Sequence, residues 1–160
     1  MRVRAFAGIL VVAAAWGLAA PVRAEEGAAS LDAAWMKAMK AGDVDGVVAC
    51  YASDAVLWFP GAPEARGTKA IRDAYAGLLS ANTVSDVVIS DTHYETVQNL
   101  SLGWGHFIMT LSPKAGGTST VMGGRFIDVA KKIDGKWRYV ADHASVGPPP
   151  EPAPATAAKP

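Results

Sequence analysis

The stretch AGDVDGVVACYASDAVLWFPGAPEARGTKAIRDAYAGLL, residues 41–79, decides the fold that this chain is expected to adopt. Gly42 is placed to end one helix and Asp43 to cap the next, whose apolar face is formed by Val44, Val47, Val48 and Tyr51. A short apolar strand is predicted at residues 55–59, and a further helix at residues 67–80. The stretch therefore predicts a helix, a strand and another helix in close succession.

The segment before this stretch predicts one more helix. Leu31, Trp35 and Met39 recur at four-residue spacing, which places them on one apolar face. Ser30 or Asp32 can cap its N-terminus, because a short polar side chain accepts a hydrogen bond from a free backbone amide there.

The segment after this stretch predicts strands. Residues rich in Val, Ile, Thr and aromatic side chains occur in four runs, at 84–97, 101–112, 119–132 and 136–146. Asp134 and Gly135 form the two-residue signal of a tight hairpin between the last two runs. The whole order predicts an α+β roll, in which three N-terminal helices pack on a curved, mostly antiparallel sheet.

The two ends of the chain differ from its middle. Residues 1–24 contain Arg2 and Arg4, then an apolar run, then small residues around Ala24, which is typical of a cleaved signal peptide and favours a periplasmic or secreted protein. Residues 148–160 are rich in Pro and Ala and predict an extended, disordered tail. The folded domain is therefore expected to span residues 28–147, with no membrane association once the signal is removed.

The composition bounds the function classes. Fifteen Lys and Arg residues balance fifteen Asp and Glu residues, so no charge excess favours nucleic acid as a partner. Cys50 is the only cysteine and is predicted to be a buried core residue, so no disulfide stabilises the fold. The three histidines lack the short spacing of a zinc site, and we expect neither a metal nor a cofactor.

Two motifs carry a resemblance to a known family. These are the stretch at residues 41–79 and GGRFIDVAKKIDGKWRYVADHAS at residues 123–145. With their order of helices and strands, they resemble the nuclear transport factor 2-like superfamily, in its SnoaL-like and ketosteroid-isomerase-like branch. The resemblance implies a conical fold in which helices and sheet enclose one pocket, and it implies that a homodimer is common.

The resemblance also locates the positions that steroid isomerases use. Their catalytic tyrosine falls on Trp35, their carboxylate base on Phe59, and their protonated aspartic acid on Asp128. A phenyl ring cannot accept a proton, and an indole N–H is only a donor. Steroid isomerase chemistry by that arrangement is therefore excluded, although an apolar pocket with one carboxylate is expected to remain.

Strand alternation extends the expected pocket. If Asp128 points inward, so do Phe126 and, across the hairpin, Arg138, Val140, Asp142 and Ala144. The family resemblance implies that His106, Ile108 and Thr110 also point inward. Two close carboxylates in an apolar pocket should raise the pKa of one of them, so Asp128, Asp142 and His106 are the candidate acid/base group. The expected ligand-binding residues are Trp35, Met39, Leu57, Phe59, Phe126 and Val140.

The function itself is left between two classes. One is an exported domain that binds an apolar or amphipathic small molecule, with isomerase- or lyase-like proton transfer. The other is a non-catalytic, dimerising carrier or accessory module, in which Asp142 and His106 are merely satisfied polar groups of the core. The end GKWRYVADHASVGPPP, residues 135–150, resembles the calcium/calmodulin-dependent kinase II association domain and favours this second class. For the dimer, Trp137, Tyr139 and Phe107 are expected on the sheet face away from the pocket, or at its edge.

Overall fold

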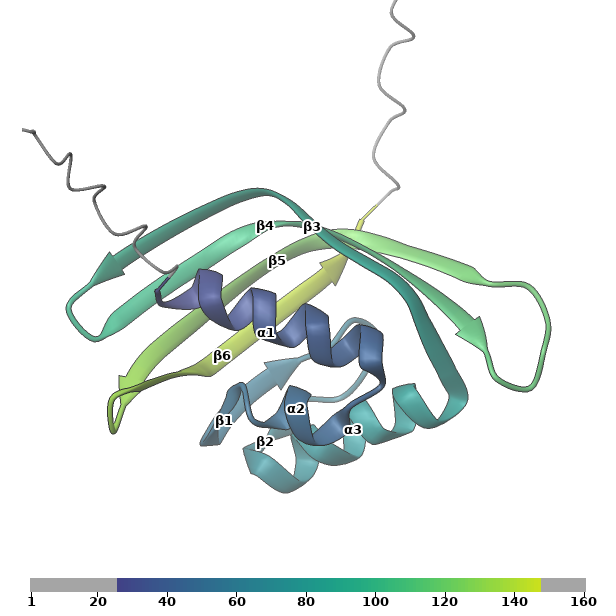
Figure 1. Cartoon of the computed structure of the whole chain (residues 1–160), viewed down its shortest axis with the longest axis horizontal. Helices are drawn as coiled ribbons and strands as arrows, with labels where there is room; N and C mark the ends of the chain where they lie inside the picture. The colour runs from purple at the N-terminus through teal and green to yellow at the C-terminus, as the bar shows by residue number, and fades with distance from the viewer. Residues whose placement is uncertain (1–25, 148–160) are drawn as a thin grey trace, which may run out of the picture.

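The computed structural model describes residues 26–147, so the predicted signal peptide and tail lie outside the described residues. Apart from the short strand β2, the elements follow the predicted order: α1 (Ala28–Ala41), α2 (Val44–Val48), β1 (Tyr51–Trp58), β2 (Ala65–Arg66), α3 (Gly67–Ala81), β3 (Asn82–Val97), β4 (Leu100–Pro113), β5 (Thr120–Ile133) and β6 (Lys136–Val146). Figure 1 shows the long strands arching over the helices, which lie against the concave side of the sheet. The predicted α+β roll is confirmed.

One six-stranded sheet contains all the strands, in the order β2-β1-β6-β5-β4-β3. All neighbouring strands are antiparallel except β1 and β6, which run parallel with Leu57 opposite Asp142. This pairing brings the strand between the helices beside the last strand of the chain. Residues distant in sequence therefore meet on the concave face.

The caps of the helices explain where they begin and end. Gly42 adopts the left-handed conformation, with φ of 66°, after the last turn of α1, and the Asp43 side chain accepts a 2.9 Å hydrogen bond from the Gly46 amide at the start of α2. The prediction that Ser30 or Asp32 caps α1 is wrong. The helix begins at Ala28, whose amide donates to Ser101 Oγ of β4 at 3.0 Å.

Tyr51 was expected on the second helix but is the first residue of β1. Its partner across the parallel pair is Tyr139 of β6, and the Tyr139 amide donates to the Cys50 carbonyl at 2.8 Å. These contacts with β6 replace the further helical turn that local periodicity favours. The strand thus begins four residues earlier than the 55–59 prediction and ends at Trp58.

A β-bulge in β6 determines which side chains face the helices. Ala130 pairs with Tyr139, but Val129 pairs with Ala141, so Val140 is the extra residue. On either side of Val140 the alternation changes phase, so Tyr139 and Asp142 both point to the concave face, as the lining of the cavity shows. The bulge is what places Asp142 directly opposite Asp128.

The core lies between the concave face of the sheet and the helices. Met39, Ile71 and Tyr75 from the helices are buried there, together with Leu57 and Met109 from the sheet. Cys50 is buried as predicted, and burial raises the pKa of its thiol to about 11. No helix within residues 26–147 is long and apolar enough to cross a membrane.

Candidate functional site

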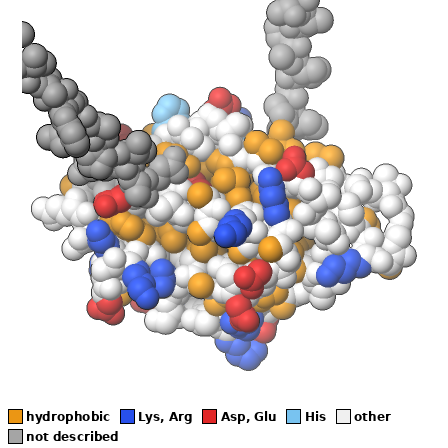
Figure 2. Space-filling model, viewed as in Figure 1, with side chains coloured by type: hydrophobic (Ala, Val, Ile, Leu, Met, Phe, Trp, Pro, Cys, Tyr) orange, Lys and Arg blue, Asp and Glu red, His pale blue; other side chains and the backbone are white. Residues whose placement is uncertain are grey.

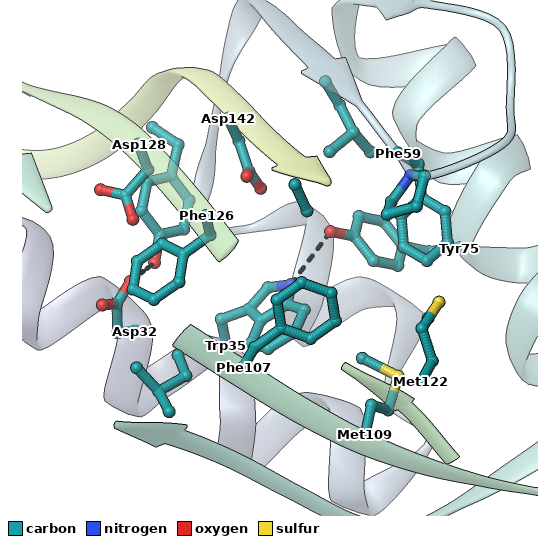
Figure 3. A pocket seen from close by; sticks show the side chains of 15 residues that line it. Asp32, Trp35, Phe59, Tyr75, Phe107, Met109, Met122, Phe126, Asp128 and Asp142 are labelled. Carbon is teal, nitrogen blue, oxygen red and sulfur yellow. Dashed lines mark hydrogen bonds between the residues drawn. The ribbon is translucent and has the colours of Figure 1, made fainter. Parts of the chain in front are cut away.

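A cavity opens between the concave face and helices α1 and α3. Its empty space, together with the open solvent at its mouth, is about 540 Å³. Apolar side chains form most of the wall, and carboxyl groups gather at one end: in Figure 3, Asp32, Asp128 and Asp142 lie away from Phe59, Met109 and Met122. The cavity is thus apolar along its length and acidic at one end.

Most of the predicted pocket residues line this cavity, but some do not. Trp35, Leu57, Phe59, Phe126, Asp128 and Asp142 are in its wall. Met39 was expected there but is fully buried in the core, below the cavity surface. Val140 was also expected there, but as the bulge residue it leaves the inward positions to Tyr139 and Asp142.

His106 does not join the two carboxylates, so that part of the prediction is wrong. In β4 the inward residues are Gly103, Gly105, Phe107 and Met109, because Gly103 pairs with Asp128 and Gly105 with Phe126. His106 pairs with Arg125 and points to the other face, where its side chain is 51% exposed and its Nδ1 lies 3.4 Å from Asp91 Oδ2. Ile108, also expected inward, is exposed on the same outer side.

The prediction that Trp137, Tyr139 and Phe107 form an exposed apolar patch, on the sheet face away from the pocket or at its edge, is also wrong. Tyr139 and Phe107 are buried and line the cavity. Trp137 is half-buried and packs against the core. All three are therefore unable to form an exposed patch on the outer face.

Asp32 is the site residue that the sequence did not reveal. It lies within α1, is 3% exposed, and accepts hydrogen bonds from Tyr139 Oη and, at 2.7 Å, from Tyr94 Oη. Burial raises the pKa of its carboxyl, while the hydrogen bonds from Tyr139 and Tyr94 oppose that rise. A usable signal was present: Asp32 precedes Trp35 by three residues and so interrupts an apolar helical face.

Asp128 is the least satisfied polar group in the cavity. It is 2% exposed, and its Oδ1 has no hydrogen-bond partner among the described residues. Burial first, and then the charges of Asp32 and Asp142, raise the pKa of Asp128 to about 9. At neutral pH Asp128 is therefore protonated.

Gly103 leaves the room that the Asp128 carboxyl occupies. A Cβ at position 103 would lie 2.9 Å from Asp128 Oδ1 and 3.1 Å from Oδ2. Gly105 has the same relation to Phe126, because a Cβ there would lie 3.1 Å from the phenyl ring. The two glycines of β4 thus set the depth of the cavity wall.

Asp142 ends a directed chain of hydrogen bonds. Trp35 Nε1 can only donate, and it donates to Tyr75 Oη at 3.0 Å. Tyr51 Oη donates to Asp142 Oδ2, so the Tyr75 hydroxyl donates in turn to Tyr51 Oη, 2.7 Å away. Burial raises the pKa of Asp142 to about 6, although the Tyr51 bond opposes the rise. Asp142 is thus ionised at neutral pH but close to its titration range.

Phe59 lies at the opposite end from Asp32 and packs edge-on against Tyr75, with ring centroids 6.1 Å apart. It contributes only apolar surface at the position where steroid isomerases have their base. Within residues 26–147, no group of three His, Cys, Asp or Glu side chains is arranged to hold a metal ion.

Comparison with known proteins agrees with this architecture. Residues 33–140 match the SnoaL-like domain family, so the chain belongs to that family. Among solved structures, it is similar to a ketosteroid isomerase-like protein from Erwinia carotovora, at 22% identity over 74% of this chain and 92% of that one, with a TM-score of 0.65. The predicted relationship to the nuclear transport factor 2-like superfamily is confirmed.

Two further structures share the fold. A protein of the NTF2-like family from Streptomyces avermitilis, named as a dehydratase, is 17% identical over 74% of this chain and 92% of that one, with a TM-score of 0.66. A protein from Xanthomonas campestris named for the calcium/calmodulin-dependent protein kinase II association domain is 24% identical over 76% and 86%, with a TM-score of 0.67. Among curated proteins, none matches the chain. These likenesses establish the fold and leave the activity to the residues of the cavity.

Proposed function

We propose that this domain binds an apolar or amphipathic small molecule in the cavity and transfers a proton within it, in the manner of an isomerase or lyase. The observation that carries the proposal is the pair Asp128 and Asp142, which face each other across β5 and β6 in an apolar wall. Their environments separate their pKa values, to about 9 and about 6. Such a separation provides one protonated and one ionised carboxyl at neutral pH.

The two carboxyls suit different tasks. A general base works best when its pKa lies near the working pH, which favours Asp142 as the group that accepts and returns a proton. Asp128, with Asp32 behind it, is placed to bind the polar group of the ligand. The chain from Trp35 through Tyr75 and Tyr51 holds Asp142 in position.

The experiment begins with the ligand that the protein retains. Native mass spectrometry of protein purified from its own host should reveal a bound small molecule. When that molecule is incubated with the protein in deuterium oxide, deuterium should enter one of its carbon positions, and Asp142→Asn should abolish the exchange. Asp54→Asn is the matched control, because Asp54 is an exposed aspartate of β1. A retained molecule that exchanges no deuterium would contradict the catalytic part of the proposal.

The second candidate function is a non-catalytic, dimerising carrier, and the outer face of the sheet favours it. Val88, Ile108 and Ile127 are exposed there by 44%, 36% and 47%, and Val88 pairs directly with Ile108. A second copy of the chain covering this face would bury them. Light scattering should then give a dimer mass at tens of micromolar, and a monomer would contradict the dimer.

Export to the periplasm or the cell exterior is the last part of the proposal. It is supported by the arginines, apolar run and small residues of segment 1–24. The exported protein should begin at Glu25, whereas exported protein that begins at Met1 would contradict cleavage.

A further inference from the structure

The side-chain donors in the cavity wall are already engaged by the protein. Besides protonated Asp128, three of the lining side chains carry a neutral N–H or O–H donor, and each of these three has a protein acceptor. Trp35 donates to Tyr75, Tyr75 to Tyr51, and Tyr139 to Asp32. A ligand that needs a hydrogen bond from one of these groups would have to break an existing one.

The side-chain acceptors are not all engaged. Asp128 Oδ1 is buried and has no partner in the described part of the chain. Asp32 and Asp142 add negative charge around this carboxyl, which raises the pKa of Asp128. The acidic end therefore presents a free oxygen that lacks a donor, and a buried acceptor without a donor is costly.

The charges around this oxygen are of one sign. Asp32 faces it from α1 and Asp142 from β6, with the neutral hydroxyls of Tyr94 from β3 and Tyr139 from β6 bound to Asp32. No Lys, Arg or His is among the residues that line the cavity. An anionic ligand would meet only like charge at this end, whereas a cation would be attracted to it.

We propose that the cavity selects a molecule with an apolar body and a protonated amine, whose ammonium group donates to Asp128 Oδ1. The apolar body contacts the apolar part of the wall, which includes Leu57 and Met122. The ammonium group binds at the end with the three carboxyls. The inference rests on the part of the proposed function that a small molecule enters the cavity. It holds whether or not a proton is then transferred.

Matched probes on one bicyclic skeleton test this inference. Aminotetralin, tetralol, tetralone and tetralin carboxylate, each substituted at the same carbon, differ only in the polar group. Calorimetry with the folded protein should give an affinity for the amine at least about tenfold higher than for the alcohol or ketone, and no measurable binding of the carboxylate. An amine that binds no better than the ketone or the carboxylate would overturn the inference while leaving the proposed function intact.

The pH dependence and a variant sharpen the test. Protons on Asp128 and Asp142 compete with the cation, so affinity for the amine should rise as pH increases from about 6 to about 9, while affinity for the alcohol stays constant. Asp128→Leu, which removes the acceptor oxygen, should lower affinity for the amine by about tenfold and leave the alcohol within about threefold, with Asp54→Asn unchanged. If Asp128→Leu does not fold, the wild-type pH profile decides.

Failure of all four probes to bind would overturn both this inference and the proposal that the cavity takes ligands of this size. An affinity for the amine that does not change with pH would overturn the assignment of its partner to the carboxyl cluster.

Discussion

The two faces of the strands β4, β5 and β6 carry different chemistry on alternate residues. On β5, Phe126, Asp128 and Ala130 face the helices, whereas Arg125 and Ile127 face away and are exposed. The concave face combines buried carboxyls with aromatic rings, while the opposite face mixes apolar and charged groups. Figure 2 shows that charged side chains of both signs are also interspersed over the surface on the side seen there. A shift of the strand register by one residue would therefore turn the carboxyls and aromatic rings to the outer face. It would bring the side chains of the outer face into the cavity wall.

Deleting Val140 should have the largest effect on this difference between faces. Without the extra residue, Tyr139 and Asp142 cannot both face inward, so either the bond to Asp32 or the bond to Tyr51 is lost. We expect a loss of at least about 4 kcal/mol in the free energy of unfolding, or no folded protein. Urea denaturation measures it, with Val140→Ala as the control. A deletion variant as stable as this control would show that the bulge does not set the register.

Replacing Asp128 should separate shape from charge on the concave face. Asp128→Asn resembles the protonated acid, so at about pH 4 or below, where ionisation of the unfolded chain no longer weakens the wild type, it should change the free energy of unfolding by less than about 0.5 kcal/mol. Asp128→Ala leaves a gap beside Gly103 in the buried wall, so it should cost about 2–3 kcal/mol. Equal costs for the two variants, measured by urea denaturation, would contradict a protonated Asp128.

The stability costs of one substitution on each face, Tyr139→Phe and His106→Ala, should compare the two faces directly. Tyr139→Phe deletes a hydrogen bond to the buried Asp32 carboxyl and should cost about 2 kcal/mol. His106→Ala on the outer face removes only an exposed contact with Asp91 and should cost less than about 0.5 kcal/mol. Thermal unfolding of both variants checks this, and a larger cost for His106→Ala would place that residue in the core after all.

The pH dependence of the free energy of unfolding should be dominated by Asp128 on the concave face. The pKa of Asp128 is raised from 3.8 to about 9, so the folded protein keeps a proton that the unfolded chain loses. Stability from this group is complete at low pH and is lost as pH rises through this interval. We expect the free energy of unfolding to fall by at least about 1.4 kcal/mol between about pH 5 and about pH 8, and Asp128→Asn to remove most of that fall. A wild-type stability that rises over this range would have the wrong sign.

Much of the fold could be predicted because its signals are local. Gly42 and Asp43 mark the boundary between the first two helices, and both cap as expected. Asp134 and Gly135 both adopt positive φ, as a tight two-residue hairpin requires. The parallel pairing of β1 with β6 and the short strand β2 were not predicted, because those pairings depend on contacts between segments distant in sequence.

The candidate site was harder to predict because it depends on which alternate residues of each strand face the cavity. Asp128 and Asp142 were found by alternation, but alternation across the hairpin cannot foresee the bulge at Val140 that turns Tyr139 inward. Likewise, which side chains of β4 point inward depends on the pairing of Gly103 with Asp128. The resemblance to the family predicted instead that His106 points inward. The position of Asp32 near the start of a helix predicts a cap, because an aspartate there usually is one.

The most direct test of the account is a carbon-detected NMR titration of the aspartate side chains. It measures whether the concave face holds its carboxyls in separate protonation states. We expect Asp128 to remain protonated at neutral pH, with a pKa of about 9, and Asp142 to titrate at about 6. Ordinary, independent titrations of Asp128 and Asp142 near about 4 would contradict a shared buried site, and the proposed proton transfer would be contradicted with it.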